Sequence, residues 1–288
     1  MTVNHDAHSV YHFYFGDRTG RPGTNLTFFP WPNARSGRPG RGQVSATAFA
    51  VPPSSLEDWT ARLDEHAVSS ERGERMDESF LRLRDPDGLP LELVATEEPE
   101  DASPWTDGPV PEPLAIKAFH AAEIRVGDPE PLAAVLTGLL GFERERAGEE
   151  RGRYVVGEEG ARARRVDLVA DPEGGSGREG AGTIHHIAFR VPDEETQKSV
   201  RERFVEAGLN PTPPIDRYYF RSVYVRVPGG VLFEIATDQP GFLIDEDESE
   251  LGSGLRLPPW LESQRSSIEA QLPELDTTVA TEEHESAP

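Results

Sequence analysis

The sequence predicts an α+β fold made of repeated βαβββ modules whose strands form curved mixed sheets. Three segments each begin with a short β-strand, pass through a Pro-, Asp- or Ser-containing turn and enter an amphipathic helix: residues 43–68, 119–142 and 185–209. Two modules also end alike, because residues 86–92 and 228–234 both read Pro-x-Gly-x-x-x-Glu. This ending predicts a tight turn that leads into a strand with a glutamate at the same place.

A further, partial module precedes these three. Residues 9–17 and 24–31 predict strands separated by a Gly- and Pro-containing turn, but nothing before them predicts the opening strand and helix. We therefore expect the first module to be truncated at its N-terminus and to leave one sheet edge uncovered.

The modules group into two halves with a linker between them. We expect an N-terminal half over residues 1–98, a Pro-rich acidic linker over 99–113 and a C-terminal half over 114–242. Residues 243–288 predict an acidic C-terminal extension, with one helix over residues 258–272 and a disordered end over residues 276–288.

Composition excludes several classes of function. The 288 residues contain no cysteine, which excludes disulfides, thiolate zinc sites, iron–sulfur clusters and cysteine nucleophiles. The formal net charge of −23 disfavours nucleic acid and anionic membranes as partners, and no apolar run is long enough for a membrane span. Only two basic residues are lysines, so the excess acid resembles that of salt-adapted, halophilic proteins. No secretory signal is visible, and the expected location is cytoplasmic.

Strand alternation brings three polar side chains onto one face of the last module. Neighbouring residues of a strand point to opposite faces, so the apolar residues mark the face beneath the helix. These apolar positions are Ile187, Phe189, Val191, Val223, Val225, Val227, Val231, Phe233 and Ile235. His186, Tyr224 and Glu234 fall on the other face, while His185 falls on the apolar side. An imidazole and a carboxylate on one concave surface favour a non-haem metal site, although a solvent-facing polar surface is the simpler interpretation.

Several longer strings resemble a known family. They are YHFYFGDRTGRPGTNLTFFPWP, DPDGLPLELVAT, GTIHHIAFRVPD, DRYYFRSVYVRVPGGVLFEIATDQPGF and DEDESELGSGLRLPPWL. The chain is similar to the vicinal oxygen chelate superfamily of glyoxalases, bleomycin-resistance proteins and extradiol dioxygenases, and most of all to ring-cleaving dioxygenases that act on hydroquinones. This resemblance implies that His186 and Glu234 bind the metal. It also implies that His185, Arg217 and Tyr224 surround the aromatic diol as catalytic residues.

One family feature is missing from the sequence. The family carries its first metal histidine in an opening strand of the first module, and that strand is absent here. His12 and His120 are the internal candidates to replace it. In the family the first and fourth modules surround the metal, and His120 opens the third module, so we interpret His120 as structural. Glu92 matches Glu234 in the repeat, but its module has no histidine, so we interpret it as a polar remnant.

The resulting expectation is an Fe(II)-dependent ring-cleaving dioxygenase, with Mn(II) as the alternative metal. Its partners would be a small aromatic substrate and O₂, and the protein could form a homo-oligomer. Two alternatives remain open. One is a glyoxalase-like metal-dependent isomerase or lyase, for which Glu92 is the only repeat-matched extra ligand. The other is a non-catalytic protein that binds an aromatic compound.

Overall fold

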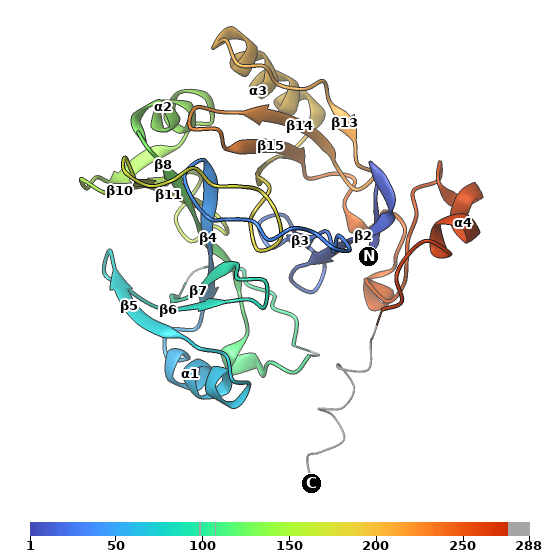
Figure 1. The fold of residues 1–288 in the computed structure, drawn as a ribbon, viewed down its shortest axis with the longest axis horizontal. Helices are drawn as coiled ribbons and strands as arrows, with labels where there is room; N and C mark the ends of the chain where they lie inside the picture. Colours follow the sequence, from blue (N-terminus) through green and yellow to red (C-terminus); the bar gives the residue numbers. More distant parts are fainter. Residues whose placement is uncertain (98, 107, 276–288) are drawn as a thin grey trace.

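The computed structural model describes residues 1–97, 99–106 and 108–275, and its strands form three sheets (Figure 1). A three-stranded sheet has the order β1-β2-β3, with β1 at Thr2–Asn4, β2 at Ala7–Phe15 and β3 at Leu26–Phe28. An eight-stranded sheet has the order β5-β6-β7-β4-β8-β11-β10-β9, and a four-stranded sheet has the order β12-β15-β14-β13.

The remaining strands have the following bounds: β4 Gln43–Val51, β5 Glu71–Arg75, β6 Glu78–Arg84, β7 Pro90–Ala95, β8 Ala118–Val126, β9 Glu143–Arg146, β10 Arg151–Val155, β11 Arg165–Ala170, β12 Ile187–Val191, β13 Ile215–Asp216, β14 Arg221–Arg226 and β15 Leu232–Thr237. The α-helices are α1 Leu56–Glu65, α2 Glu130–Leu139, α3 Glu194–Glu206 and α4 Arg265–Glu269. Four short 3₁₀ helices within the described residues are η1 Glu112–Leu114, η2 Phe242–Ile244, η3 Glu248–Glu250 and η4 Glu262–Gln264.

The predicted βαβββ pattern is confirmed in three modules. They are β4-α1-β5-β6-β7, β8-α2-β9-β10-β11 and β12-α3-β13-β14-β15. In each module the opening strand pairs in parallel with the last strand, because the helix carries the chain back across the sheet. The first module contributes the strands β1, β2 and β3, and its truncation stays a prediction.

The second and third modules join into one curved sheet. Their opening strands, β4 and β8, pair antiparallel along most of their length, from Gln43 opposite Arg125 to Ala50 opposite Ala118. The two predicted halves therefore share one continuous sheet, although the expected linker separates β4 from β8 in the sequence. The first and fourth modules are left to face each other on the other side of the molecule (Figure 1).

Helices α2 and α3 pack over a shared apolar core of the third and fourth modules. This core includes Leu132 and Leu136 of α2, Phe204 of α3, and Val223 and Phe233 of the last sheet, all of them fully buried. The valines and aromatics that the alternation assigned to the helix side lie here. Burying that face fixes the strand register, because a one-residue slip would expose every one of these side chains. The polar face of β14 and β15 is thereby held toward the first module.

The repeated Pro-x-Gly ending forms the predicted tight turn in both places. Gly88 and Gly230 have φ values of +90°, a region that side chains with a Cβ rarely adopt. After each turn the strand pairs with its module's opening strand, so that Glu92 lies opposite Ala48 and Glu234 lies opposite Ala188. The repeat seen in the sequence therefore has an equivalent position in space.

The C-terminal extension covers the first strand. Val3 of β1 packs with Leu257, Leu261 and Ile268, and all four are buried. The predicted terminal helix is shorter than expected, since only η4 and α4 are helical in this region. The predicted disordered end begins at residue 276 and lies outside the described residues. None of the helices in the described part of the chain has the length and apolarity needed to span a bilayer.

Candidate active site

A cavity of about 1230 Å³ lies between the first and fourth modules. Its aromatic lining includes Phe28, Phe29, Trp31, Phe119, Phe220 and Phe242. The polar groups predicted from the sequence, His185, His186, Arg217, Tyr224 and Glu234, all line the same cavity. Mostly apolar walls with a few convergent polar groups are typical of a site for a small organic ligand.

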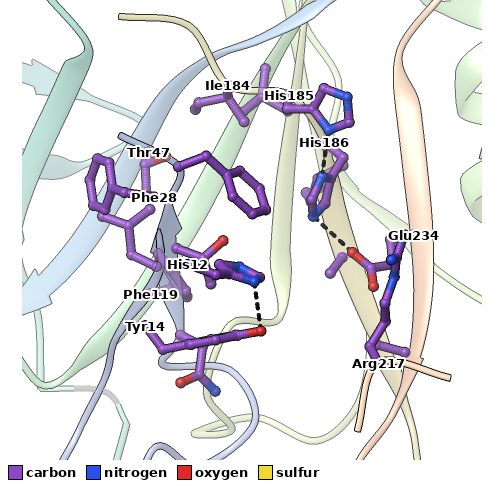
Figure 2. A pocket seen from close by; sticks show the side chains of 18 of the residues that line it. His12, Tyr14, Phe28, Thr47, Phe119, Ile184, His185, His186, Arg217 and Glu234 are labelled. Atoms are coloured by element: carbon purple, nitrogen blue, oxygen red, sulfur yellow. Dashed lines mark hydrogen bonds and ion pairs between the residues drawn. The ribbon is translucent and has the colours of Figure 1, made fainter. Parts of the chain in front are cut away.

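His186 and Glu234 are in direct contact on the cavity wall (Figure 2). His186 Nε2 lies 2.8 Å from Glu234 Oε2, and the glutamate side chain is only 4% exposed. The hydroxyl of Ser222 donates to the other carboxylate oxygen. Burial tends to raise the pKa of Glu234, but the hydrogen bond and charge of His186, together with Ser222, outweigh it and lower the pKa. The site therefore presents a carboxylate beside the His186 ring at neutral pH.

Tyr224 and Arg217 continue this polar wall. Tyr224 lies opposite Glu234 in the strand register, and the Arg217 guanidinium carbon lies 5.6 Å from the centre of the Tyr224 ring. Burial and the negative charge of Glu234 raise the pKa of Tyr224 to about 12, so its hydroxyl stays protonated at neutral pH. Arg217 Nη1 donates to Asp6 Oδ2 at 3.0 Å, which ties the arginine to the turn between β1 and β2.

His185 also reaches the site, although alternation placed it on the helix side. Its Nδ1 lies 2.9 Å from Nδ1 of His186. The strand β12 begins only at Ile187, so both histidines lie in irregular backbone where strict alternation does not apply. Burial and the neighbouring His186 lower the pKa of His185.

His12, which the sequence offered as a candidate to replace the absent metal histidine, lies on the opposite wall of the cavity together with Tyr14, which the sequence reasoning missed. Both come from β2 and share one face of that strand, two positions apart. His12 Nδ1 lies 2.8 Å from the Tyr14 hydroxyl. Figure 2 shows them facing His186 and Glu234 across the pocket. The His-x-Tyr spacing predicts that the two side chains share one face of the strand. Only the packing of the first module on the fourth shows that this face lines the cavity.

The residues present supply part of a metal site. A 2-His-1-carboxylate site needs three protein donors, and His186 with Glu234 provides two. Within residues 1–97, 99–106 and 108–275, no group of three or more His, Asp or Glu side chains comes together in a way that could hold a metal ion. The described side chains therefore do not fit a complete iron site.

His120 and Glu92 belong to the eight-stranded sheet and not to this cavity. His120 is 2% exposed and its Nε2 lies 2.8 Å from Glu78 Oε1, consistent with the structural role expected for it. Glu92 is more than a polar remnant: it is 1% exposed and accepts hydrogen bonds from Arg75 and Arg82. These two arginines occupy its carboxylate, so Glu92 cannot act as the additional ligand that a glyoxalase-like isomerase would need here.

Acid is expected to destabilise this ion cluster through Glu78. Burial tends to raise the pKa of Glu78, but His120 and Arg153 outweigh it and lower the pKa to about 2. A carboxyl with a lowered folded-state pKa stabilises the fold above its ordinary pKa near 4.5 and loses that contribution as the pH falls toward 2. Thermal unfolding from pH 6 to pH 2 should show a smaller acid-dependent loss in Glu78→Gln than in the unmodified protein. Equal losses in the two proteins would contradict this assignment.

The comparisons with known proteins agree with this architecture. The sequence pattern of the Glyoxalase/Bleomycin resistance protein/Dioxygenase superfamily matches residues 118–235. A Bacillus subtilis (strain 168) protein described as a ring-cleaving dioxygenase, MhqO, is 41% identical over 272 residues, which cover 94% of this chain and 86% of the relative. The chlorohydroquinone/hydroquinone 1,2-dioxygenase of Sphingobium indicum is 34% identical, over 91% of this chain and 83% of that protein.

Solved structures show the same relationship. The crystal structure of a protein described as a dioxygenase from Bacillus subtilis superposes with a TM-score of 0.90 at 41% identity, covering 96% of this chain and 87% of the other. Glyoxalase I from Zea mays has a TM-score of 0.54 at 15% identity, over 74% and 73% of the two chains, and so shares the fold alone. Fold and site define a glyoxalase-fold protein with a candidate metal-binding cavity. The chain belongs to the glyoxalase/bleomycin resistance/dioxygenase superfamily, and it is homologous to ring-cleaving dioxygenases over most of its length.

Proposed function

We propose that this protein is a dioxygenase that opens the ring of hydroquinone- or catechol-like aromatic diols. The single observation that carries the proposal is the His186–Glu234 pair, which lines an aromatic cavity in a chain similar along its length to ring-cleaving dioxygenases. Iron(II) is the proposed metal and manganese(II) the alternative, because both accept nitrogen and oxygen donors. Either ion would need a donor in addition to this pair.

The chain's own groups would bind and orient the diol. The aromatic walls exclude water and pack against the ring, which places its hydroxyl beside the His186–Glu234 pair. Arg217 is cationic and can stabilise an ionised hydroxyl of the substrate. Burial tends to lower the pKa of Arg217, but Tyr224 and Asp6 outweigh burial and raise that pKa. Tyr224 can donate a hydrogen bond to the substrate or pass it a proton, since its hydroxyl remains protonated. His185 would hold the His186 ring through their Nδ1 contact.

Oxygen uptake tests the proposal directly. Protein supplied with Fe(II) should consume O₂ in the presence of hydroquinone, and mass spectrometry with ¹⁸O₂ should detect a ring-opened product that contains two labelled oxygen atoms. A parallel series with Mn(II) compares the two metals. If protein that demonstrably holds iron consumes no O₂ with hydroquinone or catechol, the dioxygenase proposal is rejected.

Binding without catalysis is the second candidate. The observation that favours it is the presence of two metal-binding side chains, and not three, among the described residues at the cavity. This alternative predicts that metal-free protein binds hydroquinone and that adding Fe(II) changes neither the affinity nor the oxygen consumption. Calorimetric titration with and without Fe(II) distinguishes the two candidates.

A further inference from the structure

The His12 side chain lines the cavity and carries a buried ring nitrogen that no described residue satisfies. Its Nε2 atom is buried and has no hydrogen-bond partner among the described residues. The ring lies between two other aromatic rings, with centroid distances of 4.0 Å to Tyr14 and 4.2 Å to Phe29. Leaving a buried polar atom unpaired costs free energy, so a ligand group that pairs with this nitrogen would remove that cost.

The Tyr14 hydroxyl fixes the direction of the His12 ring. The two groups are 2.8 Å apart through Nδ1, which leaves Nε2 as the free nitrogen. Burial and the neighbouring Tyr219 raise the pKa of Tyr14 well above its ordinary value, so the phenol stays neutral. Burial and nearby positive groups lower the pKa of His12 to about 3, so the imidazole is neutral as well. A neutral imidazole offers one donor or one acceptor at Nε2, according to its tautomer.

The position of His12 suits the far end of an aromatic diol. His12 faces His186 and Glu234 across the pocket, and these three residues line the same cavity (Figure 2). A hydroxyl can both donate and accept, so a hydroxyl at this end satisfies Nε2 in either tautomer. On the basis of the function proposed above, we propose that His12 binds the second hydroxyl of a 1,4-diol whose first hydroxyl lies at the His186–Glu234 pair. His12 would therefore make the site prefer a para-diol to a phenol or an ortho-diol.

Anaerobic calorimetric titrations with hydroquinone, phenol and catechol test this role. The unmodified protein should bind hydroquinone about 3- to 10-fold more tightly than phenol, which is the effect of one neutral hydrogen bond. His12→Phe keeps an aromatic ring between Tyr14 and Phe29 but removes the nitrogen. It should bind hydroquinone and phenol equally, with its affinity for phenol unchanged. His66→Phe, at an exposed position after α1, is the matched control and should keep the preference for hydroquinone.

The Tyr14→Phe variant tests whether the orientation of the His12 ring matters in addition to the presence of its Nε2 atom. This variant removes the hydroxyl that orients the His12 ring while leaving Nε2 in place, so the preference for hydroquinone should fall to a value between those of the unmodified protein and His12→Phe. Thermal unfolding of each variant shows whether it is folded at the titration temperature, and a folded His12→Leu variant replaces His12→Phe if the latter does not fold.

The outcomes distinguish this inference from the proposed function. A preference for hydroquinone that survives in folded His12 variants, or that is absent from the unmodified protein, overturns the role of His12 even if oxygen uptake is normal. A preference that depends on His12 supports that role even if no ring cleavage occurs, in which case the dioxygenase proposal alone fails. If none of the three compounds binds, the role of His12 is overturned, and oxygen uptake by iron-loaded protein decides the dioxygenase proposal separately.

Discussion

Replacing Glu234 with glutamine is expected to lower kcat/KM for ring cleavage by more than about 100-fold, because loss of a group that merely supports a metal ligand already costs 10- to 100-fold. Glutamine keeps the size of the side chain and can still pair with Ser222, but it removes the negative charge beside His186. Oxygen uptake with hydroquinone measures the activity, and the iron retained after gel filtration measures metal binding.

The control for this experiment is Glu202→Gln on the exposed face of α3, where the side chain is 58% exposed. Its activity and iron content should match those of the unmodified protein. A Glu234→Gln protein that keeps both its iron and more than a tenth of its activity would show that Glu234 is not the metal carboxylate.

Replacing Asp167 with alanine is expected to lower the free energy of unfolding by about 3–5 kcal/mol, the usual cost of removing one partner from a buried ion pair. Asp167 and Arg153 each have side chains that are 2% exposed. Arg153 donates to the two carboxylate oxygens of Asp167 from Nε at 2.7 Å and from Nη2 at 3.0 Å. Without Asp167, the buried guanidinium retains Glu78 as its only carboxylate partner among the described residues. Urea unfolding followed by circular dichroism measures the change.

The Glu130–Arg144 pair provides a matched comparison at the surface. Its atoms are 2.9 Å apart, but the two side chains are 69% and 42% exposed. Glu130→Ala should therefore change the free energy of unfolding by less than about 1 kcal/mol. A loss in Asp167→Ala as small as that in Glu130→Ala would mean that water reaches the Arg153 cluster and screens it.

Much of the candidate site could be predicted from strand alternation. The pattern that buried Val223, Val225, Phe233 and Ile235 also placed Tyr224 and Glu234 together, and the structure pairs these last two residues across β14 and β15. Alternation failed for His185, because its backbone precedes β12 and side chains alternate between two faces only within a strand. The repeat of the Pro-x-Gly-x-x-x-Glu ending likewise predicted equivalent positions for Glu92 and Glu234, which the strand registers confirm.

The same repeat could not show that the two glutamates have different surroundings. Glu234 lies beside a histidine on a cavity wall, whereas the buried carboxylate of Glu92 is held by Arg75 and Arg82. The arginines occupy neighbouring strands of the eight-stranded sheet, and nothing in the glutamate's own segment specifies them. The role of a charged side chain depends on which opposite charges the fold brings to it.

The amino-acid sequence by itself determined the modules, their turns and the face of each strand on which a polar side chain lies, because backbone geometry and local apolar patterning set these features over a few residues. The tertiary structure decided which modules face each other. Only the packing of β2 against the fourth module brings His12 and Tyr14 across a cavity from His186 and Glu234. That contact joins segments far apart in the chain, and it depends on the combined burial of several sheets, which no local pattern in the sequence encodes.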